Sequence, residues 1–159
     1  MKHVFIFSAI TILILLTACG DADDAENAKP MSAESMVKET ENYDPHRGEG
    51  KWNEQNVIFN IPLNKEWSES GRMIAEVKCS ACHKTSTEKL VGPGWHGVTK
   101  RRSPVWIMNF ITNPDPMIDK DQEAQAMLEL CLVRMPNQNL SDVEARNILE
   151  YMFSLEEVK

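Results

Sequence analysis

Five consecutive residues constrain this chain more than any other feature: Cys79, Ser80, Ala81, Cys82 and His83. Two thiols three positions apart lie on one helical turn, so both can reach the vinyl groups at one edge of a porphyrin. The histidine that follows then lies beneath the ring and presents an imidazole nitrogen to the iron. The spacing C-x-x-C-H therefore predicts one covalent c-type haem, with Cys79 and Cys82 as thioether residues and His83 as an axial ligand.

Three other interpretations of this motif explain less of the sequence. A zinc site would need a second pair of ligands, and the chain has none at a suitable spacing. A dithiol redox centre usually opens a helix after a strand, whereas the segment before Cys79 has a helical pattern. A simple disulfide explains neither the histidine nor the spacing. The four cysteines, at positions 19, 79, 82 and 131, are also too few and too irregular for a disulfide scaffold.

The first eighteen residues predict an export signal. A short positive start is followed by the largely apolar run Val4 to Ala18, which at 15 residues is short for a spanning helix. Small residues precede Cys19, as in the lipobox of bacterial lipoproteins, where the cysteine receives the lipid. We expect an exported protein that is lipid-anchored to a membrane and faces the periplasm or the cell exterior. An ordinary cleaved signal or an uncleaved anchor remains the alternative.

Composition divides the rest of the chain. Residues 20–50 contain nine acidic against three basic residues and almost no large apolar ones, so we expect residues 19–50 to form a flexible tether. Residues 51–65 carry a small apolar group and predict an extended flap on the domain; the group comprises Trp52, Val57, Ile58, Phe59, Ile61 and Leu63. Residues 66–159 form the predicted domain. The net charge of −7 argues against a nucleic-acid binder.

The predicted domain has helical patterns and no persistent strand alternation, which indicates an all-α fold. The first helix runs from about Glu66 into Cys79, with one apolar side formed by Met73, Ile74 and Val77. Ser103 and Pro104 have the residue types of an N-cap and a first helical position, and the helix that they begin ends at Asn113-Pro114.

Two more helices follow in the sequence. Asp119 or Asp121 opens a helix that carries Ala124, Met127, Leu128, Cys131 and Leu132. Ser141 and Glu144 have the spacing of a capping box and predict the start of the last helix. The buried stripe expected on that helix consists of Val143, Ile148, Met152 and Leu155.

Residues 66–157 resemble the small class I cytochromes c. Gly71, eight positions before Cys79, matches the family glycine at which the first and last helices cross, and Tyr151 matches the aromatic residue that packs there. The segment Gly92 to Gly97 resembles the family loop in which a proline carbonyl accepts a bond from the proximal histidine, so Pro93 is implied as that proline. The resemblance implies helices wrapped around one covalent haem.

The segment from Met135 to Ser141 resembles the family segment that supplies the axial methionine before the last helix. Two residues depart from the family pattern. Ala75 stands where the family often has an aromatic residue, and Trp95 replaces a common leucine. These departures concern local packing more than haem binding.

The chain has nine methionines, so the second axial ligand of the haem iron has to be selected among them. Methionines at helical spacing are usually core residues, which fits Met73, Met108, Met127 and Met152. Met135 instead lies between a helix and Pro136, 52 residues after His83, in a loop that can reach the far side of the ring. Met117 lies in another proline-rich loop and competes with it. The resemblance favours Met135, and a His/Met pair raises the reduction potential relative to bis-His ligation.

The remaining candidate residues have secondary roles. His96 follows His83 by 13 positions in the proximal loop, and we expect it at the surface or near a propionate. His46 lies in the predicted tether. Pro93 and Trp95 are expected in the haem pocket, where Arg101 or Arg102, with Trp106, could hold a propionate. Cys131 is expected to be a buried inert thiol rather than a redox or intermolecular one.

Charge is distributed unevenly around the motif. Residues 72–102 carry seven basic and two acidic side chains, whereas residues 110–159 carry four basic and ten acidic ones. The basic half is either an ordinary solvated surface or a surface that steers docking to an acidic redox partner.

We therefore expect an electron carrier, not an enzyme, between a quinol-oxidising complex and a terminal oxidase or reductase. The segments 100–103 and 137–140 resemble small cytochromes that accompany nitrous oxide reductases. The alternative is a haem enzyme or gas sensor with an open sixth position, and a haem-free dithiol oxidoreductase explains less.

Overall fold

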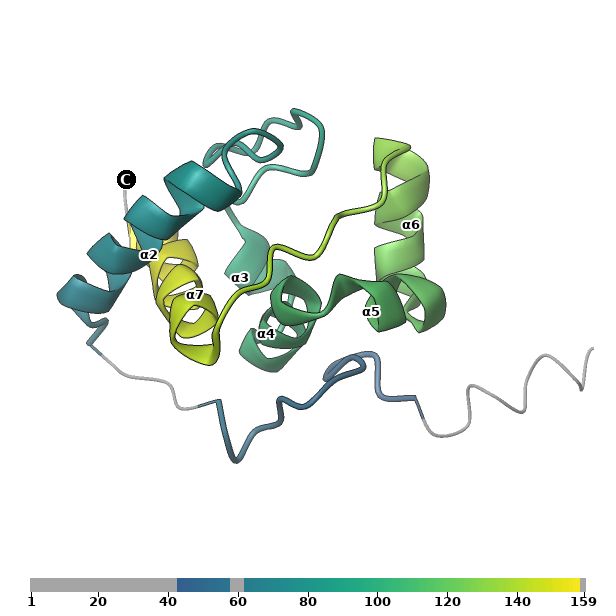
Figure 1. The fold of residues 1–159 in the computed structure, drawn as a ribbon, viewed down its shortest axis with the longest axis horizontal. Coiled ribbons are helices and arrows are strands. Elements are labelled where there is room, and N and C mark those ends of the chain that lie inside the picture. The colour runs from purple at the N-terminus through teal and green to yellow at the C-terminus, as the bar shows by residue number, and fades with distance from the viewer. Residues whose placement is uncertain (1–42, 58–61, 158–159) are drawn as a thin grey trace, which may run out of the picture. The chain divides into compact units, whose positions relative to one another are not determined.

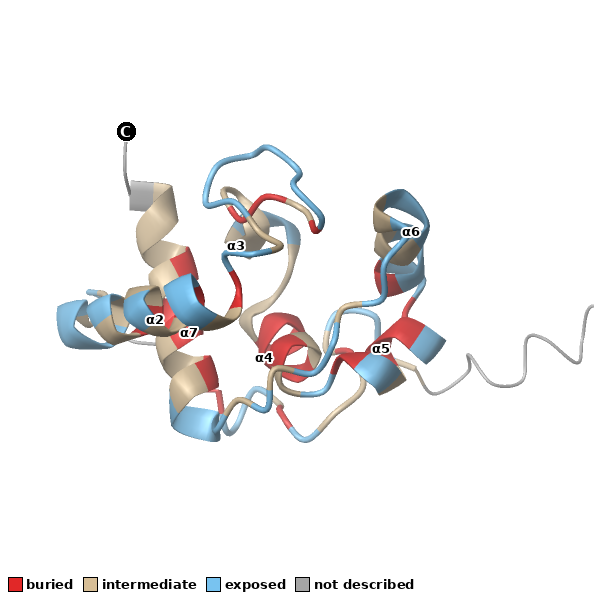
Figure 2. Ribbon diagram, turned by 45° about the horizontal axis from the view of Figure 1, so that its top comes forward, coloured by how far each residue is buried: buried red, intermediate tan, exposed pale blue. Residues whose placement is uncertain are grey.

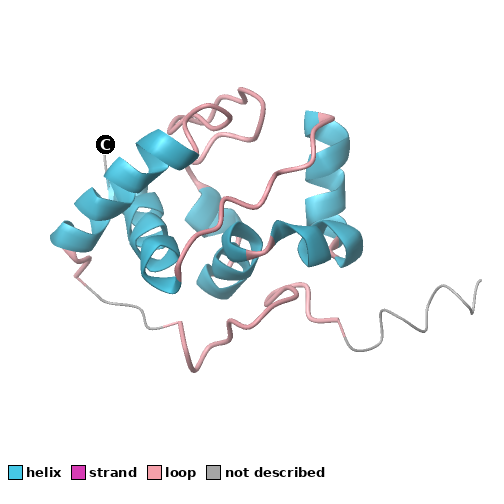
Figure 3. Cartoon of the chain, viewed as in Figure 1, coloured by secondary structure: helices cyan, strands magenta, loops and turns pink. Residues whose placement is uncertain are grey.

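Six helices make up the described part of the chain, which in this computed structural model consists of residues 43–57 and 62–157. In chain order the helices are α2 (Lys65–Lys78), α3 (Val98–Arg101), α4 (Pro104–Thr112), α5 (Pro114–Lys120), α6 (Gln122–Cys131) and α7 (Asp142–Glu157) (Figure 1). Long loops join them, and the described residues form no strand (Figure 3). The all-α prediction is confirmed. Within this part of the chain, no helix is long and apolar enough to cross a membrane.

The first and last helices of the domain, α2 and α7, pack against each other more extensively than any other pair. Gly71 lies at their crossing. A Cβ atom at this position would lie only 2.0 Å from the backbone oxygen of Asn147, so the crossing requires glycine. The expected role of this glycine as a crossing residue agrees with the geometry.

Side-chain caps explain where four helices begin. Asn64 accepts from the Trp67 amide and caps α2, and Ser103 accepts from the Trp106 amide and caps α4. Asp121, rather than Asp119, caps α6 through the Ala124 amide. At the start of α7, the Ser141 amide donates to the carboxylate of Glu144, and the Glu144 amide donates back to the Ser141 hydroxyl, as a capping box requires.

Helix α5 replaces the proline-rich loop that the sequence predicted between residues 113 and 117. Pro114 occupies the first turn, where a missing N–H costs nothing. Pro114, Met117 and Ile118 are buried, so tertiary packing stabilises this seven-residue helix despite its two prolines.

Two predicted apolar faces are wrong in part. Met73 and Val77 are 51% and 84% exposed, because α2 turns the small residues Gly71 and Ala75 toward α7. Val143 is 70% exposed in the first turn of α7, whereas Ile148 and Met152 are buried as expected. Close helix crossing selects small residues, and the apolar pattern alone does not show this.

The last part of the predicted tether packs on the helices instead of extending from them. Residues 43–57, which we call the strap, run along α4 and α5 (Figure 1). Gly48, Trp52 and Val57 are buried (Figure 2 shows the burial of the whole fold). The folded part therefore includes residues 43–50, which the acidic composition had assigned to the tether. Ile58, Phe59, Ile61, the predicted export signal 1–18 and Cys19 lie outside the described residues.

Candidate functional site

The two cysteines of the motif lie on a turn that continues α2. Cys79 is the C-cap of α2, and the amides of Cys82 and His83 both donate to its carbonyl oxygen at 3.0 Å. Cys79 is buried and Cys82 half-buried, and neither forms a disulfide. Burial raises the pKa of Cys79 to about 11, and its neighbour Lys78 offsets only part of this effect. The Cys79 side chain is therefore a neutral thiol at physiological pH.

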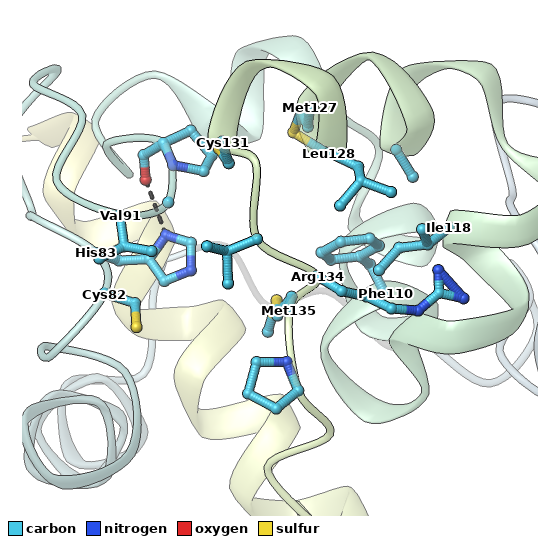
Figure 4. Close-up of a pocket in the computed structure, with 15 residues that line it drawn as sticks. Cys82, His83, Val91, Phe110, Ile118, Met127, Leu128, Cys131, Arg134 and Met135 are labelled. Carbon is cyan, nitrogen blue, oxygen red and sulfur yellow. Dashed lines mark hydrogen bonds between the residues drawn. The ribbon is translucent and has the colours of Figure 1, made fainter.

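The imidazole of His83 is fixed by the loop that follows. Its Nδ1–H donates to the carbonyl oxygen of Pro93 at 2.8 Å (Figure 4), which leaves Nε2 as the atom able to bind a metal. Burial lowers the pKa of His83, and the Pro93 bond offsets part of that shift. A neutral imidazole with its proton on Nδ1 is the form that ligates iron.

Gly92 allows this loop to approach the imidazole. A Cβ atom at Gly92 would lie 2.4 Å from Cε1 of His83. Only a residue without a side chain brings the Pro93 carbonyl within hydrogen-bonding distance of the ring at this point. The local sequence therefore sets the orientation of His83.

Two adjoining cavities, a smaller and a larger one, open beside the motif. Cys82, His83, Met135 and Phe110 line both cavities, and Cys79 lines the larger one. His83 and Met135 lie 52 residues apart in the sequence, and the close-up shows both at the same pocket (Figure 4).

The predicted pocket residues all line the larger cavity: Pro93, Trp95, Arg101, Arg102 and Trp106. The side chains of three of them also contact other residues of the domain. Arg101 donates to the carbonyl oxygens of Gly94 and His96. Arg102 pairs with Glu123 and lies 5.1 Å from the centre of the Trp106 ring. The Trp106 indole N–H donates to Asp121, which is fully buried.

The competing axial candidates lie away from the cavities. Met117 is fully buried in α5, where its sulfur accepts the Glu49 amide at 2.9 Å. His96 donates through Nδ1 to the Leu155 carbonyl at 3.2 Å, and His46 lies exposed on the strap. Met127, Met135 and Met152 line cavities with His83, and of these three only Met135 lies in a loop, whereas Met117 lines neither cavity.

Cys131 is less buried than expected. The structure places it half-buried on the wall of the smaller cavity, one turn before Met135, rather than in a closed core. Met127 and Met152, expected as core residues, line the cavities as well. Sequence reasoning missed Phe110 and Gln138. Phe110 lies four positions after Trp106 and stacks on it at 4.9 Å, and this helical spacing was the available signal.

This set of groups fits a covalent haem. Two thiols, a neutral imidazole, a thioether and apolar side chains surround one cavity. Gly92 has no side chain that would displace the imidazole of His83. Among residues 43–57 and 62–157, no group of three or more His, Cys, Asp and Glu side chains could hold a bare metal ion. The zinc alternative thus has no support in the described part of the chain.

Comparison with known proteins agrees with this geometry. The sequence profile of the family described as Cytochrome c matches residues 68–156. A cytochrome c from Rhodothermus marinus is 31% identical, with a TM-score of 0.64 over 67% of this chain and 91% of that one. An engineered cytochrome c from the same organism, bound to a carbene intermediate, is 30% identical with a TM-score of 0.62, over 72% of this chain and 99% of that one. No curated protein sequence matches.

The family match covers more than half of the chain and includes the whole of the C-x-x-C-H motif and the loop that carries Met135. The helical fold and the apolar cavity beside the motif agree with it. The chain therefore belongs to the cytochrome c family and is an electron carrier with covalently bound haem c.

Proposed function

We propose that this chain is a membrane-tethered monohaem cytochrome that passes single electrons between respiratory redox partners. Cys79 and Cys82 form the thioethers, and His83 and Met135 are the axial ligands. The observation that carries the proposal is that His83 and Met135 line the larger cavity together with both thiols. Haem iron in such a site exchanges one electron and returns unchanged, so no substrate is turned over.

The protein's own groups would tune that exchange. The Pro93 carbonyl accepts the His83 Nδ1–H, which holds the ring in one orientation and makes its other nitrogen a better donor. The thioether of Met135 favours ferrous iron and raises the reduction potential. Apolar side chains such as Trp95, Ile107 and Phe110 line the cavity and exclude water from the iron.

The basic half of the domain supports docking to an acidic partner less strongly than its sequence suggested. Five of its seven cations form ion pairs, namely Arg72, Lys78, Lys84, Lys100 and Arg102. Lys89 and Arg101 form no ion pair with the described residues. We propose that the donor is a quinol-oxidising complex and the acceptor a terminal oxidase or reductase, nitrous oxide reductase being one candidate. Steering predicts that transfer rates fall with added salt.

The proposed membrane tether depends on Cys19 and the export signal. A lipid on this cysteine would keep the domain at a membrane surface, on the periplasmic or outer side, without a spanning helix. Cys19→Ser should release haem-loaded protein into the soluble fraction of cells that mature c-type cytochromes. Membrane retention of this variant, with its signal cleaved, would refute lipid anchoring through Cys19.

One optical experiment tests the axial assignment. The oxidised wild type should show a methionine–iron charge-transfer band, and its reduced form should resist carbon monoxide. Met135→Ala should lose the band and bind carbon monoxide readily. Met117→Leu is the matched control and should keep the band, because Met117 is buried in α5 away from the cavities. Carbon monoxide binding by the reduced wild type would favour a haem enzyme or gas sensor instead.

A further inference from the structure

The strap (residues 43–57) is bonded to α4 through one buried side chain. Asn109, which is fully buried, donates through Nδ2 to the carbonyl oxygens of Arg47 and Trp52, at 3.0 and 3.2 Å. Its Oδ1 accepts the Trp52 amide at 2.9 Å. The Asn109 side chain thus bonds to backbone groups of the strap, as the backbone of a neighbouring strand would in a sheet. These bonds fix the strap on α4.

The strap also contacts α5 at close range. The Glu49 amide donates to the sulfur of Met117 at 2.9 Å. Gly48 has a φ of +76° and packs so tightly on Met117 that a Cβ atom would lie 2.5 Å from its methyl carbon. Both the backbone conformation and the contact require glycine at this position.

Helices α4 and α5 in turn hold the loop that carries Met135, residues 132–141 between α6 and α7, which we call the methionine loop. Before Met135, Arg134 donates to Asp115 of α5 at 3.1 Å and also pairs with Asp119. After it, Asn137 donates to the Thr112 carbonyl at the end of α4, at 3.4 Å.

Both anchors of the methionine loop therefore rest on elements that the strap contacts. On the α4 side the connection is short, because the Trp52 indole N–H donates to the Thr112 hydroxyl at 3.2 Å. On the α5 side the connection runs through Met117, which lies between the two aspartates that bind Arg134.

We propose that the strap is a positioning element for the axial methionine: it fixes the ends of α4 and α5 on which the methionine loop rests, and so determines how readily another ligand displaces Met135 from the iron. This inference rests on the proposed His83/Met135 ligation. Displacement requires the methionine loop to lift from Thr112 and from Asp115 and Asp119. Loosening the strap makes that movement easier without altering any group that touches the iron.

The test measures imidazole binding to the ferric holoprotein, followed by loss of the methionine–iron charge-transfer band. Trp52→Phe keeps an aromatic ring and removes the N–H that reaches Thr112, and Gly48→Ala disturbs the contact with Met117. We expect each variant to bind imidazole roughly fivefold more tightly, the size of effect that one lost hydrogen bond produces. The double variant should exceed both single variants.

The matched control is Ile148→Val, which trims a buried side chain of α7, a helix that belongs to neither the strap nor the methionine loop. It should lower the thermal midpoint about as much as Trp52→Phe and leave imidazole affinity unchanged. Unchanged affinity in both strap variants, or an equal gain in the control, would overturn the role of the strap. A wild type without the charge-transfer band would instead overturn the Met135 ligation, so the two failures are distinguishable.

Discussion

Gly71→Ala tests how closely α2 and α7 cross. An added methyl group would be built 2.0 Å from the Asn147 oxygen and 2.4 Å from the Asn147 carbonyl carbon. Both atoms belong to the backbone of α7, so no side-chain rotation relieves the overlap. The first distance is 1 Å below the 3.0 Å limit that Cβ atoms essentially never cross, and the helices must therefore move apart.

Two opposing contributions determine how much Gly71→Ala changes the free energy of unfolding. Alanine is favoured over glycine inside a helix by about 1 kcal/mol. Overpacking a well-filled interface costs about 1–3 kcal/mol and more when backbone must move. Because the obstructing atoms are backbone, we expect the upper part of that range and a net loss of about 2 kcal/mol in the free energy of unfolding.

Guanidinium unfolding of the ferric holoprotein measures this loss, with an unchanged slope as evidence that the two-state description still holds. Ser70→Ala is the matched control. Ser70 lies one residue away on α2, and its side chain forms no hydrogen bond with the described residues, so the substitution removes none. The control should be neutral or slightly stabilising. A Gly71→Ala protein as stable as wild type would show that the helices cross less closely than the structure has them.

Three further variants test other contacts. The Ser141 amide, with Lys78, lowers the pKa of Glu144 from 4.5 to about 2. The stability that this cap contributes is therefore complete above pH 4.5 and is lost as the pH falls toward 2. Glu144→Gln should flatten that part of the curve of stability against pH. Gly92→Ala should displace His83 and reduce the fraction of protein that stains for covalent haem, and normal loading would contradict the close contact. Glu150→Gln removes the buried carboxylate that pairs with Arg146, and denaturant titration should show a loss of about 3 kcal/mol in the free energy of unfolding.

The sequence predicted the parts of this fold that depend on local chemistry. Caps at Ser103 and Ser141 act through neighbouring backbone, so residue type and spacing are enough to locate them. Pro93, whose carbonyl oxygen accepts from His83 ten residues away, was instead identified through the family resemblance. Met135 was predicted as a ligand only with the help of the same resemblance, because the partner proposed for it is a cofactor rather than another residue.

The parts that sequence reasoning missed depend on contacts between distant segments. Tyr43 donates to Asp121 across 78 positions, and Trp52 bonds to Asn109 across 57, so the acidic composition around the strap gave no sign of its packing. Helix α5 escaped prediction for the same reason, since Met117 supplies the burial that two prolines argue against. Local pattern and composition do not report such long-range pairings.

Helix α6 shows why the haem belongs to the core as much as to the function. Among the described helices, α6 packs closely on α5 alone. Its half-buried side chains Met127, Leu128 and Cys131 face the cavity beside His83 instead of another helix. A haem in this cavity would cover the apolar face of α6, and its covalent attachment at Cys79 and Cys82 would join α6 to the α2–α7 pair through the cofactor. On this argument, the fold of the domain and its capacity to carry an electron depend on the same bonded group.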